Sequence, residues 1–580
     1  MSNNGNLLQL VFDCVWGVGE NIYKLFSKRK EVEKAPLDIF FQKAGLCNKD
    51  QEYPIVVETI VNNDEHLYKL SCPIGLGKRD FEKYEDALEV YLGKKIYIEF
   101  YGNEFECKEE KDMEKNEVKD LTQGNVFKLI LGFSIPLLFG MLFQQFYSMV
   151  DTIIVGKYLG VTALAEVGST GSISFMIIGF CMGVCNGFAI PVAQKFGARN
   201  YKLLRKYVFN SAILSAIFSL VMTIIVCLLC RNILEWMNTP DDIMDGAYSY
   251  IFVIFLGIPV TYLYNLLAGI IRSFGDSKTP LIFLIMSSII NIVLDLVFII
   301  IFNMGVAGAA WATVISQAVS GICCLIFMKK RYSILKFEND ELKVNGHCIR
   351  RLCYMGIPMG LQYSITAIGS VILQTAVNGL GSLVVATVTA GSKISMFLSC
   401  PFDALGSTIA TYAGQNVGAK KLDRVSEGIK SSLKIGSIYS IIAFIISIFF
   451  GKTIALLFVN GSEVELLSMV KKYLIITAAF YIPLCFVNVV RFTIQGMGYS
   501  TFAICAGVCE MVARTVCGFI LVPIFGFTAV CLASPIAWIC ADAFLIPGYI
   551  SVLKKMKKEI KLRTKEKVSD IKEVSTGIDL

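Results

Sequence analysis

Long apolar stretches follow one another along the chain from about residue 126 onwards, and each is about twenty residues or longer. About twenty apolar residues in a helix cross the hydrocarbon core of a bilayer, so each stretch predicts a membrane-spanning helix. Twelve spans are expected, over residues 127–155, 163–192, 206–229, 246–271, 280–302, 307–328, 351–377, 385–412, 428–450, 469–493, 501–523 and 527–552.

The first 118 residues have a different pattern, because polar and apolar positions alternate over short runs. Asn62-Asn63-Asp64 and Gly102-Asn103 are hairpin signals between such runs, and residues 79–92 have helical spacing. Residues 35–110 are therefore expected to form a small α+β domain. Residues 1–34 predict an amphipathic helix lying on the membrane, with a poorly packed leader as the alternative.

These patterns divide the chain into consecutive parts. The expected parts are an interfacial helix at 1–34, a cytosolic α+β domain at 35–110, a charged linker at 111–125, an N-lobe of six helices at 126–335, a cytoplasmic linker at 336–350, a C-lobe of six helices at 351–553 and a basic cytoplasmic tail at 554–580.

Composition supports a membrane protein with many spans. Of the 580 residues, 55% are hydrophobic and only 17% charged, and the mean hydropathy is +0.60. A soluble protein carries about 25% charged residues. The net charge of +7 comes without a basic face or a nucleic-acid-binding motif, so no nucleic-acid partner is expected. With only two histidines and 19 scattered cysteines, no cofactor or dedicated metal site is expected.

Basic residues indicate the orientation of the spans. Lys and Arg cluster after the second, sixth, eighth and twelfth spans, whereas the loop after the third span is acidic. The positive-inside rule then places both termini in the cytoplasm. The three cysteines of the N-terminal domain, Cys47, Cys72 and Cys107, suit a reducing cytosol.

The two sets of six spans are related by an internal repeat. Gln194-Lys195-Phe196-Gly197-Ala198-Arg199 matches Gln415-Asn416-Val417-Gly418-Ala419-Lys420 at a distance of 221 residues. Ile135-Pro136 and Ile357-Pro358 repeat at nearly the same distance. Such repeats predict two bundles with a substrate path between them, which changes its access by rocking.

Polar residues gather at one depth in the first half. Asp151 lies in the first span, Asn291 and Asp295 lie four residues apart on one face of the fifth, and Thr313 lies in the sixth. Asp151, Asp295 and Thr313 are expected about 6–10 Å below the outer surface. Their oxygens suit a proton or a sodium ion, and two neighbouring carboxylates favour proton binding. Pro136 in the first span removes a helical hydrogen bond and can bend the helix.

Structural roles remain open for these residues. Asp151 could lie in the interface beside a helix end, and Asp295 could hydrogen-bond a neighbouring helix. Asn291 and Thr313 are residue types that often join helices in membranes.

The second half differs from the first. Glu510 and Arg514 occupy the places of Asn291 and Asp295, and such a pair is either structural or a substrate contact. Asp403 and Asp542 either line a cavity or are partly exposed near the cytoplasmic end.

Five motifs in a fixed order resemble the MATE (multidrug and toxic compound extrusion) family. They are Ser148-Met149-Val150-Asp151-Thr152, Gln194-x-x-Gly-Ala-Arg199, residues 272–280 (RSFGDSKTP), Asn291-x-x-x-Asp295 and residues 305–313 (GVAGAAWAT). The resemblance covers residues 126–555 and is nearer the DinF-like branch than the NorM-like branch. Span seven has Tyr363-Ser364-Ile365-Thr366-Ala367 where NorM-like members carry a glutamate, which puts a second-lobe cation site in doubt.

The resemblance implies an all-α membrane protein whose twelve helices form two pseudo-symmetric lobes around a central cavity. It implies export of organic cations against an inward proton or sodium gradient, with the cation held by the residues matching Asp151, Asn291, Asp295 and Thr313. It also implies that Pro136 bends the first helix as the site changes protonation. A multi-pass protein of the bacterial cytoplasmic membrane, and no enzyme, is expected.

Two other functions are compatible with the sequence. The first is a lipid-linked or polysaccharide flippase of the same superfamily. The second is a membrane-bound docking component of a mobile element, because residues 73–100 resemble N-terminal segments of mobile-element coupling proteins. The N-terminal domain could dock an unknown protein in either case, and membrane lipid is an expected neighbour of all the spans.

Overall fold

The chain divides into two compact units, residues 1–119 and 120–580, each described by itself. In this computed structural model the described residues are the four strands given below, a few positions between 41 and 54, and residues 120–237, 239–338, 341–458 and 462–576. For the strands and for residues 563–576 the description is of the backbone only.

The first unit contains an antiparallel sheet of four described strands. They are β1 (Ile55–Asn62), β2 (Glu65–Ser71), β3 (Ile96–Tyr101) and β4 (Glu104–Glu109), in the order β1-β2-β4-β3. Both predicted hairpins are present, because β1 pairs with β2 and β3 pairs with β4. The helices expected over residues 1–34 and 79–92, and the linker up to residue 119, lie outside the described residues, so the α+β class of this unit stays a prediction.

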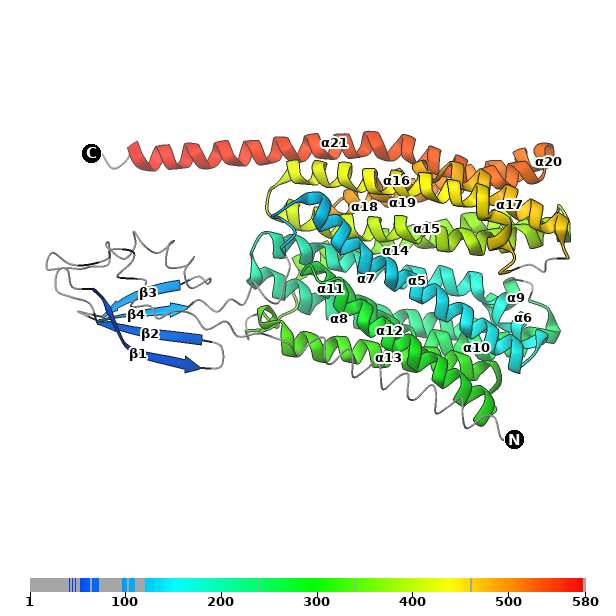
Figure 1. The fold of residues 1–580 in the computed structure, drawn as a ribbon, viewed down its shortest axis with the longest axis horizontal. Coiled ribbons are helices and arrows are strands. Elements are labelled where there is room, and N and C mark those ends of the chain that lie inside the picture. The colour runs from blue at the N-terminus through cyan, green and yellow to red at the C-terminus, as the bar shows by residue number, and fades with distance from the viewer. Residues whose placement is uncertain are drawn as a thin grey trace. The chain divides into compact units, whose positions relative to one another are not determined.

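The second unit is a bundle of helices packed side by side (Figure 1). Its first half contains α5 (Val126–Tyr158), α6 (Val161–Ser169), α7 (Gly171–Gly197), α8 (Tyr201–Leu228), α9 (Cys230–Trp236), α10 (Asp241–Leu256), α11 (Ile258–Ser273), α12 (Lys278–Leu296) with the π-helical turn η1 (Val297–Ile301), α13 (Gly305–Arg331) and the 3-10 turn η2 (Ser333–Leu335). Its second half contains α14 (Gly346–Asn378), α15 (Ser382–Gly418), α16 (Leu422–Ala455), α17 (Val464–Ala479), α18 (Tyr481–Gly496), α19 (Thr501–Val516), the π-helical turn η3 (Cys517–Leu521), α20 (Val522–Phe525) and α21 (Phe527–Thr576).

The apolar helices of the described residues provide ten to twelve candidate membrane spans. Ten helices are long and apolar enough to cross a membrane alone, and two bent pairs raise the number to as many as twelve. The bends are 44° between α10 and α11 and 49° between α17 and α18. Pro259 and Pro483 lie in the first turn after each break, where the missing N–H cannot continue the preceding helix. The chain is therefore a multi-pass membrane protein.

The second span begins later than the sequence predicts. Residues 163–192 were expected to form one span, but α6 ends at Ser169 and α7 begins at Gly171. Hydropathy cannot detect this break, because both segments are apolar. In the second half the equivalent helix α15 is continuous from Ser382.

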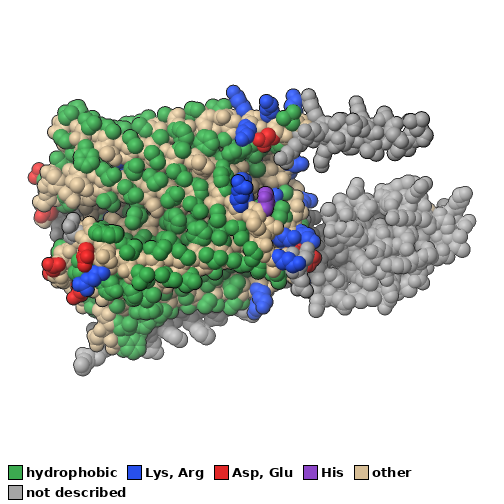
Figure 2. All heavy atoms as spheres, turned by 180° about the vertical axis from the view of Figure 1, so that it is seen from behind, with side chains coloured by type: hydrophobic (Ala, Val, Ile, Leu, Met, Phe, Trp, Pro, Cys, Tyr) green, Lys and Arg blue, Asp and Glu red, His purple; other side chains and the backbone are tan. Residues whose placement is uncertain are grey.

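Charge separates the two ends of the helical unit. Figure 2 shows Lys and Arg gathered at one end and several Asp and Glu at the opposite end. We name the first the basic end, defined by Lys202, Lys329, Lys330, Lys420, Lys421, Lys554 and Lys555. We name the second the acidic end, defined by Glu235, Asp241, Asp242 and Asp245.

Helix α5 belongs to both halves of the core. Its first part, including Ile130 and Phe133, packs with residues of α15 and α18 such as Phe402 and Val489. Its last part, including Ile154 and Val155, packs with α6 and α13 of the first half. Asn125 caps its start by accepting a hydrogen bond from the backbone N–H of Lys128. The helix thus crosses from one lobe to the other.

Glycines join the two halves near the basic end. Gly183 and Gly187 on α7 face the backbone of α14 around Gly356 and Gly360, so closely that a Cβ on either would meet it at 2.5 to 2.8 Å. Two small-xxx-small pairs of this kind let membrane helices approach along their backbones. The glycines leave this helix pair with almost no space between its backbones.

Candidate functional site

The structure brings together the four polar residues predicted in the first half. Asp151 comes from α5, Asn291 and Asp295 from α12, and Thr313 from α13. The amide Nδ2 of Asn291 donates a 3.3 Å hydrogen bond to the hydroxyl of Thr313. Asn291 and Asp295 are fully buried and Asp151 is 9% exposed. The polar residues that the sequence places at a similar depth on three helices therefore lie together in one cluster.

The two carboxyl groups of this cluster lie against each other. Both carboxyl oxygens of Asp295, one of Asp151 and the amide oxygen of Asn291 are buried without a hydrogen-bond donor. Buried polar atoms are nearly always paired, and an isolated buried charge is costly. The oxygens are the ligand type that binds a proton or a hard cation. The four residues thus have the chemistry of a cation site, although Asp295 and Asp151 as its ligands stay a prediction.

Three further residues surround the cluster and were missed in the sequence. Tyr147 and Gln317 line the same cavity as Asn291 and Thr313, and Tyr250 packs against the neighbouring core cluster that includes Ile154 and Ile299. Helical spacing could have revealed two of them. Tyr147 precedes Asp151 by four residues and Gln317 follows Thr313 by four, so each pair shares a helix face.

A π-helical turn follows Asp295 directly. It is η1, and its counterpart η3 follows Arg514 at a distance of 220 residues. Single π-helical turns inside helices occur frequently at functional sites. Each π-helical turn makes its helix wider just beyond Asp295 in the first half and just beyond Arg514 in the second half.

Pro136 lies about one third of the way along the continuous helix α5, as the eleventh of its 33 residues. It lines a cavity of about 170 Å³ that Asn291 and Thr313 also line, together with Arg272 and Tyr264. The proline therefore lies at the other end of the same internal space as the polar cluster. Its expected change of bend is a difference between states and stays a prediction.

The predicted pair of the second half is part of a triad. Arg514 lies 3.4 Å from Glu510, and Arg491 on α18 bonds the other oxygen of the same carboxylate. All three side chains are buried. Arg491 could not be assigned to this group from the sequence, because its contact depends on which helices face each other. A pair of Glu510 and Arg514 alone would be neutral. The triad has two guanidinium groups for one carboxylate, so its charges do not balance.

A central cavity of about 730 Å³ lies between the two halves, from their middle towards the acidic end. Thr313 and Tyr147 line its first-half wall, and Asp403 lines the second-half wall as expected for a cavity residue. Asp542 is buried on α21 and was not found in this lining. The cavity is within the 300–1,000 Å³ range of sites for drug-sized molecules.

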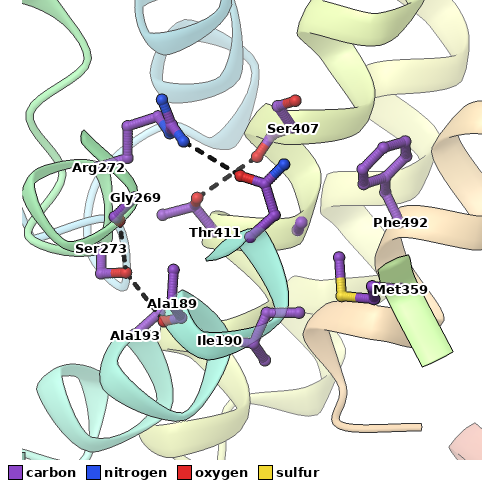
Figure 3. A pocket seen from close by; sticks show the side chains of 12 residues that line it. Ala189, Ile190, Ala193, Gly269, Arg272, Ser273, Met359, Ser407, Thr411 and Phe492 are labelled. Atoms are coloured by element: carbon purple, nitrogen blue, oxygen red, sulfur yellow. Dashed lines mark hydrogen bonds between the residues drawn. The ribbon is translucent and has the colours of Figure 1, made fainter. Parts of the chain in front are cut away.

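The basic end is closed by reciprocal contacts between the halves. Gln194 donates to the carbonyl of Gly496 at 2.9 Å, and Gln415 donates to the carbonyl of Ser273 at 2.9 Å. Figure 3 shows the small space that remains beside this closure, lined by Arg272, Ser407, Thr411 and Phe492. Its volume is only about 30 Å³. The central cavity therefore ends before the basic end.

Comparisons with known proteins agree with this architecture. The MatE family model matches residues 136–297 and 358–520, more than half of the chain. A probable multidrug resistance protein YpnP of Bacillus subtilis is 30% identical over 49% of this chain and 63% of its own length. The multidrug export protein MepA of Staphylococcus aureus strain NCTC 8325 / PS 47 is 22% identical over 49% of this chain and 63% of its own length. The aligned part thus spans less than two thirds of these relatives.

Solved structures share the fold. A MATE protein in complex with MaL6 has a TM-score of 0.71 at 22% identity and covers 76% of this chain and 99% of its own. An outward-facing multidrug resistance MATE transporter has the same score and identity, covering 76% and 98%. The two-lobed bundle with its internal cavity is the fold of these MATE structures, and the members of the MATE family are transporters, not enzymes. The chain belongs to the MATE family.

Proposed function

We propose that this protein is a secondary active exporter of organic, cationic compounds that is driven by an inward proton or sodium gradient. The observation that supports it best is the buried carboxyl pair of Asp151 and Asp295, in which three of the four oxygens are buried without a hydrogen-bond donor. A proton or a sodium ion supplies the positive partner that these oxygens need. The names of the relatives, which are multidrug export and resistance proteins, support the substrate class.

Coupling would follow from shared residues. Thr313 and Tyr147 belong both to the surroundings of the carboxyl pair and to the wall of the central cavity. A cation bound at the pair and a cationic substrate in the cavity would repel each other and draw on the same side chains. Binding of one then favours release of the other, which is the requirement for antiport. Pro136, in the same internal space, would let α5 bend as the pair is loaded.

The orientation belongs to the same proposal. The positive-inside rule places the basic end in the cytoplasm, so both termini of the chain are cytoplasmic in a bacterial cell membrane. The closed basic end and the cavity towards the acidic end then describe an outward-facing conformation.

A flippase for lipid-linked molecules is the second candidate function. The observation that favours it is the presence of Arg491 and Arg514 on the second-half wall of the cavity, since two guanidinium groups suit a phosphate group. Docking of a protein partner by the N-terminal unit stays a prediction.

Ethidium transport into proteoliposomes containing the full chain tests the exporter proposal. A proton gradient and a sodium gradient are imposed separately, beside an Asp295→Asn variant and an Asp423→Asn control at an exposed position of α16. We expect one gradient to drive transport in the wild type and the control, and the Asp295→Asn variant to lose it. Transport in that variant at the wild-type rate, or wild-type transport that no gradient changes, would refute the proposal.

A further inference from the structure

The charged side chains of the central cavity all lie on one of its walls. Among the described residues that line it, Asp403, Arg491, Glu510 and Arg514 come from the second half, whereas the first-half wall is uncharged. The carboxyl pair of Asp151 and Asp295 lies behind that uncharged wall rather than on it. A molecule in the cavity therefore meets its charged partners on the second-half wall.

The two guanidinium groups of this wall have donors to spare. Glu510 accepts one bond from Arg491 and one from Arg514. Nε of Arg491 and Nη1 of Arg514 are buried and have no hydrogen-bond partner, and the two side chains are only 7% and 8% exposed. Unpaired donors of buried arginines are costly, which indicates a partner that the chain itself does not provide.

The acidic residues nearby do not fill this role. Asp403 and Asp542 both act electrostatically on Arg491 across a distance. In the described part of the chain neither forms an ion pair or hydrogen bond with Arg491 or Arg514. Asp403 is exposed to the cavity, so it is free to face a positive group of a bound molecule.

The repeat shows that this chemistry is specific to one half. Glu510 and Arg514 occupy the places that Asn291 and Asp295 occupy in the first half, and a π-helical turn follows each pair. The first half has surplus acceptors at these places, and the second half has surplus donors. The same helix position thus carries unpaired acceptors in the first half and an unpaired donor in the second half.

We propose that Arg491 and Arg514 form a binding subsite for the carboxylate of an amphoteric, drug-sized substrate whose positive group faces Asp403. The guanidinium fork matches a carboxylate in geometry and charge. Apolar residues of the same wall and of the facing wall, such as Trp538, Phe492 and Phe175, hold the body of the molecule. The inference rests on the proposed export function, because it names a class of exported substrate.

Rhodamine B and its ethyl ester test the subsite, because they differ only in a free carboxylate. Binding of each dye to the purified full chain is measured by fluorescence polarisation for the wild type, Arg514→Gln and Arg514→Lys. Arg514→Gln leaves the ion pair between Arg491 and Glu510 in place, so the fold is expected to persist. Arg231→Gln at the exposed acidic end is the matched control.

We expect Arg514→Gln to weaken binding of the acid at least about tenfold and to leave binding of the ester within about twofold. Arg514→Lys keeps the positive charge and loses the guanidinium fork, so it should weaken binding of the acid less than Arg514→Gln does. Equal losses for both dyes, or no loss for either, would overturn the proposal. Farnesyl monophosphate is the third ligand, and a phosphate that binds more tightly than the acid and depends on Arg514 would assign the site to a lipid-linked group instead.

Gradient-driven uptake of the ester separates this proposal from the export function. If the ester is not transported but the acid still binds through Arg514, the export proposal fails and the subsite remains. If the ester is transported and Arg514 makes no difference to the acid, the subsite fails alone.

Discussion

Gln194 and Gln415 occupy equivalent places in the two halves, 221 residues apart, and each donates a hydrogen bond to a backbone carbonyl of the opposite half. Three residues beyond each, Gly197 and Gly418 lie against the carbonyl of the other glutamine. The internal repeat of the sequence thus becomes a reciprocal lock at the basic end. If the chain is the exporter proposed above, alternating access requires this lock to open, since the cavity ends at it.

Gly197→Ala should weaken the lock. A methyl group at this position would overlap the backbone oxygen of Gln415, so the two helices must separate. Overpacking of this kind costs about 1–3 kcal/mol. We expect faster hydrogen–deuterium exchange at the ends of α7 and α15 and a lower melting temperature. Gly171→Ala, at the opposite end of α7 with no atom near its Cβ, is the control. Equal exchange in both variants would contradict the lock.

Gln415→Leu should cost more stability than Gln194→Leu. Gln415 also accepts a 2.9 Å hydrogen bond from the backbone N–H of Leu121, so its loss leaves two buried backbone groups unpaired. Loss of Gln194 leaves one. Each unpaired buried group costs about 1–3 kcal/mol. Thermal unfolding of the two variants in the same detergent gives the order, and an equal loss or the reverse order would show that these hydrogen bonds do not determine the stability.

Much of the architecture could be predicted from hydropathy and the repeat. The spans and the gathering of Asp151, Asn291, Asp295 and Thr313 follow from helix length and depth, which one-dimensional patterns record. The break at Thr170 could not be predicted, because the segments before and after it are equally apolar. The passage of α5 between the halves could not be predicted either, because both parts of this helix are equally apolar.

Contacts between helices from different parts of the chain could not be predicted from the sequence. Arg491 completes the charged triad only because α18 faces α19, and no spacing along the chain records that. Gly183, Gly187, Gly356 and Gly360 were visible as two spaced pairs but were not interpreted. They could have indicated a close helix crossing, although not which helix meets which.

A coupling cation should stabilise the protein through the aspartate pair. A ligand at a hundredfold its Kd adds about 2.7 kcal/mol to the free energy of unfolding. We expect the melting temperature to rise with added sodium at constant ionic strength, or with acidification if the proton is the coupling ion. Asp295→Asn should lose this rise because it removes one carboxylate of the pair. The exposed Asp423→Asn should keep it, and a rise that survives in Asp295→Asn would place the cation elsewhere.

Glu510→Gln should destabilise the fold far more than Arg514→Gln. Glu510 is the only carboxylate that bonds Arg491 and Arg514 among the described residues, so its loss leaves two buried guanidinium groups without a counter-charge in contact. Removing one partner of a buried ion pair costs about 3–5 kcal/mol. Arg514→Gln keeps the pair between Arg491 and Glu510 intact. Thermal unfolding compares the two variants directly. If both lower the melting temperature equally, Asp403 or Asp542 balances the charge of Arg491, and Glu510 is not the centre of the triad.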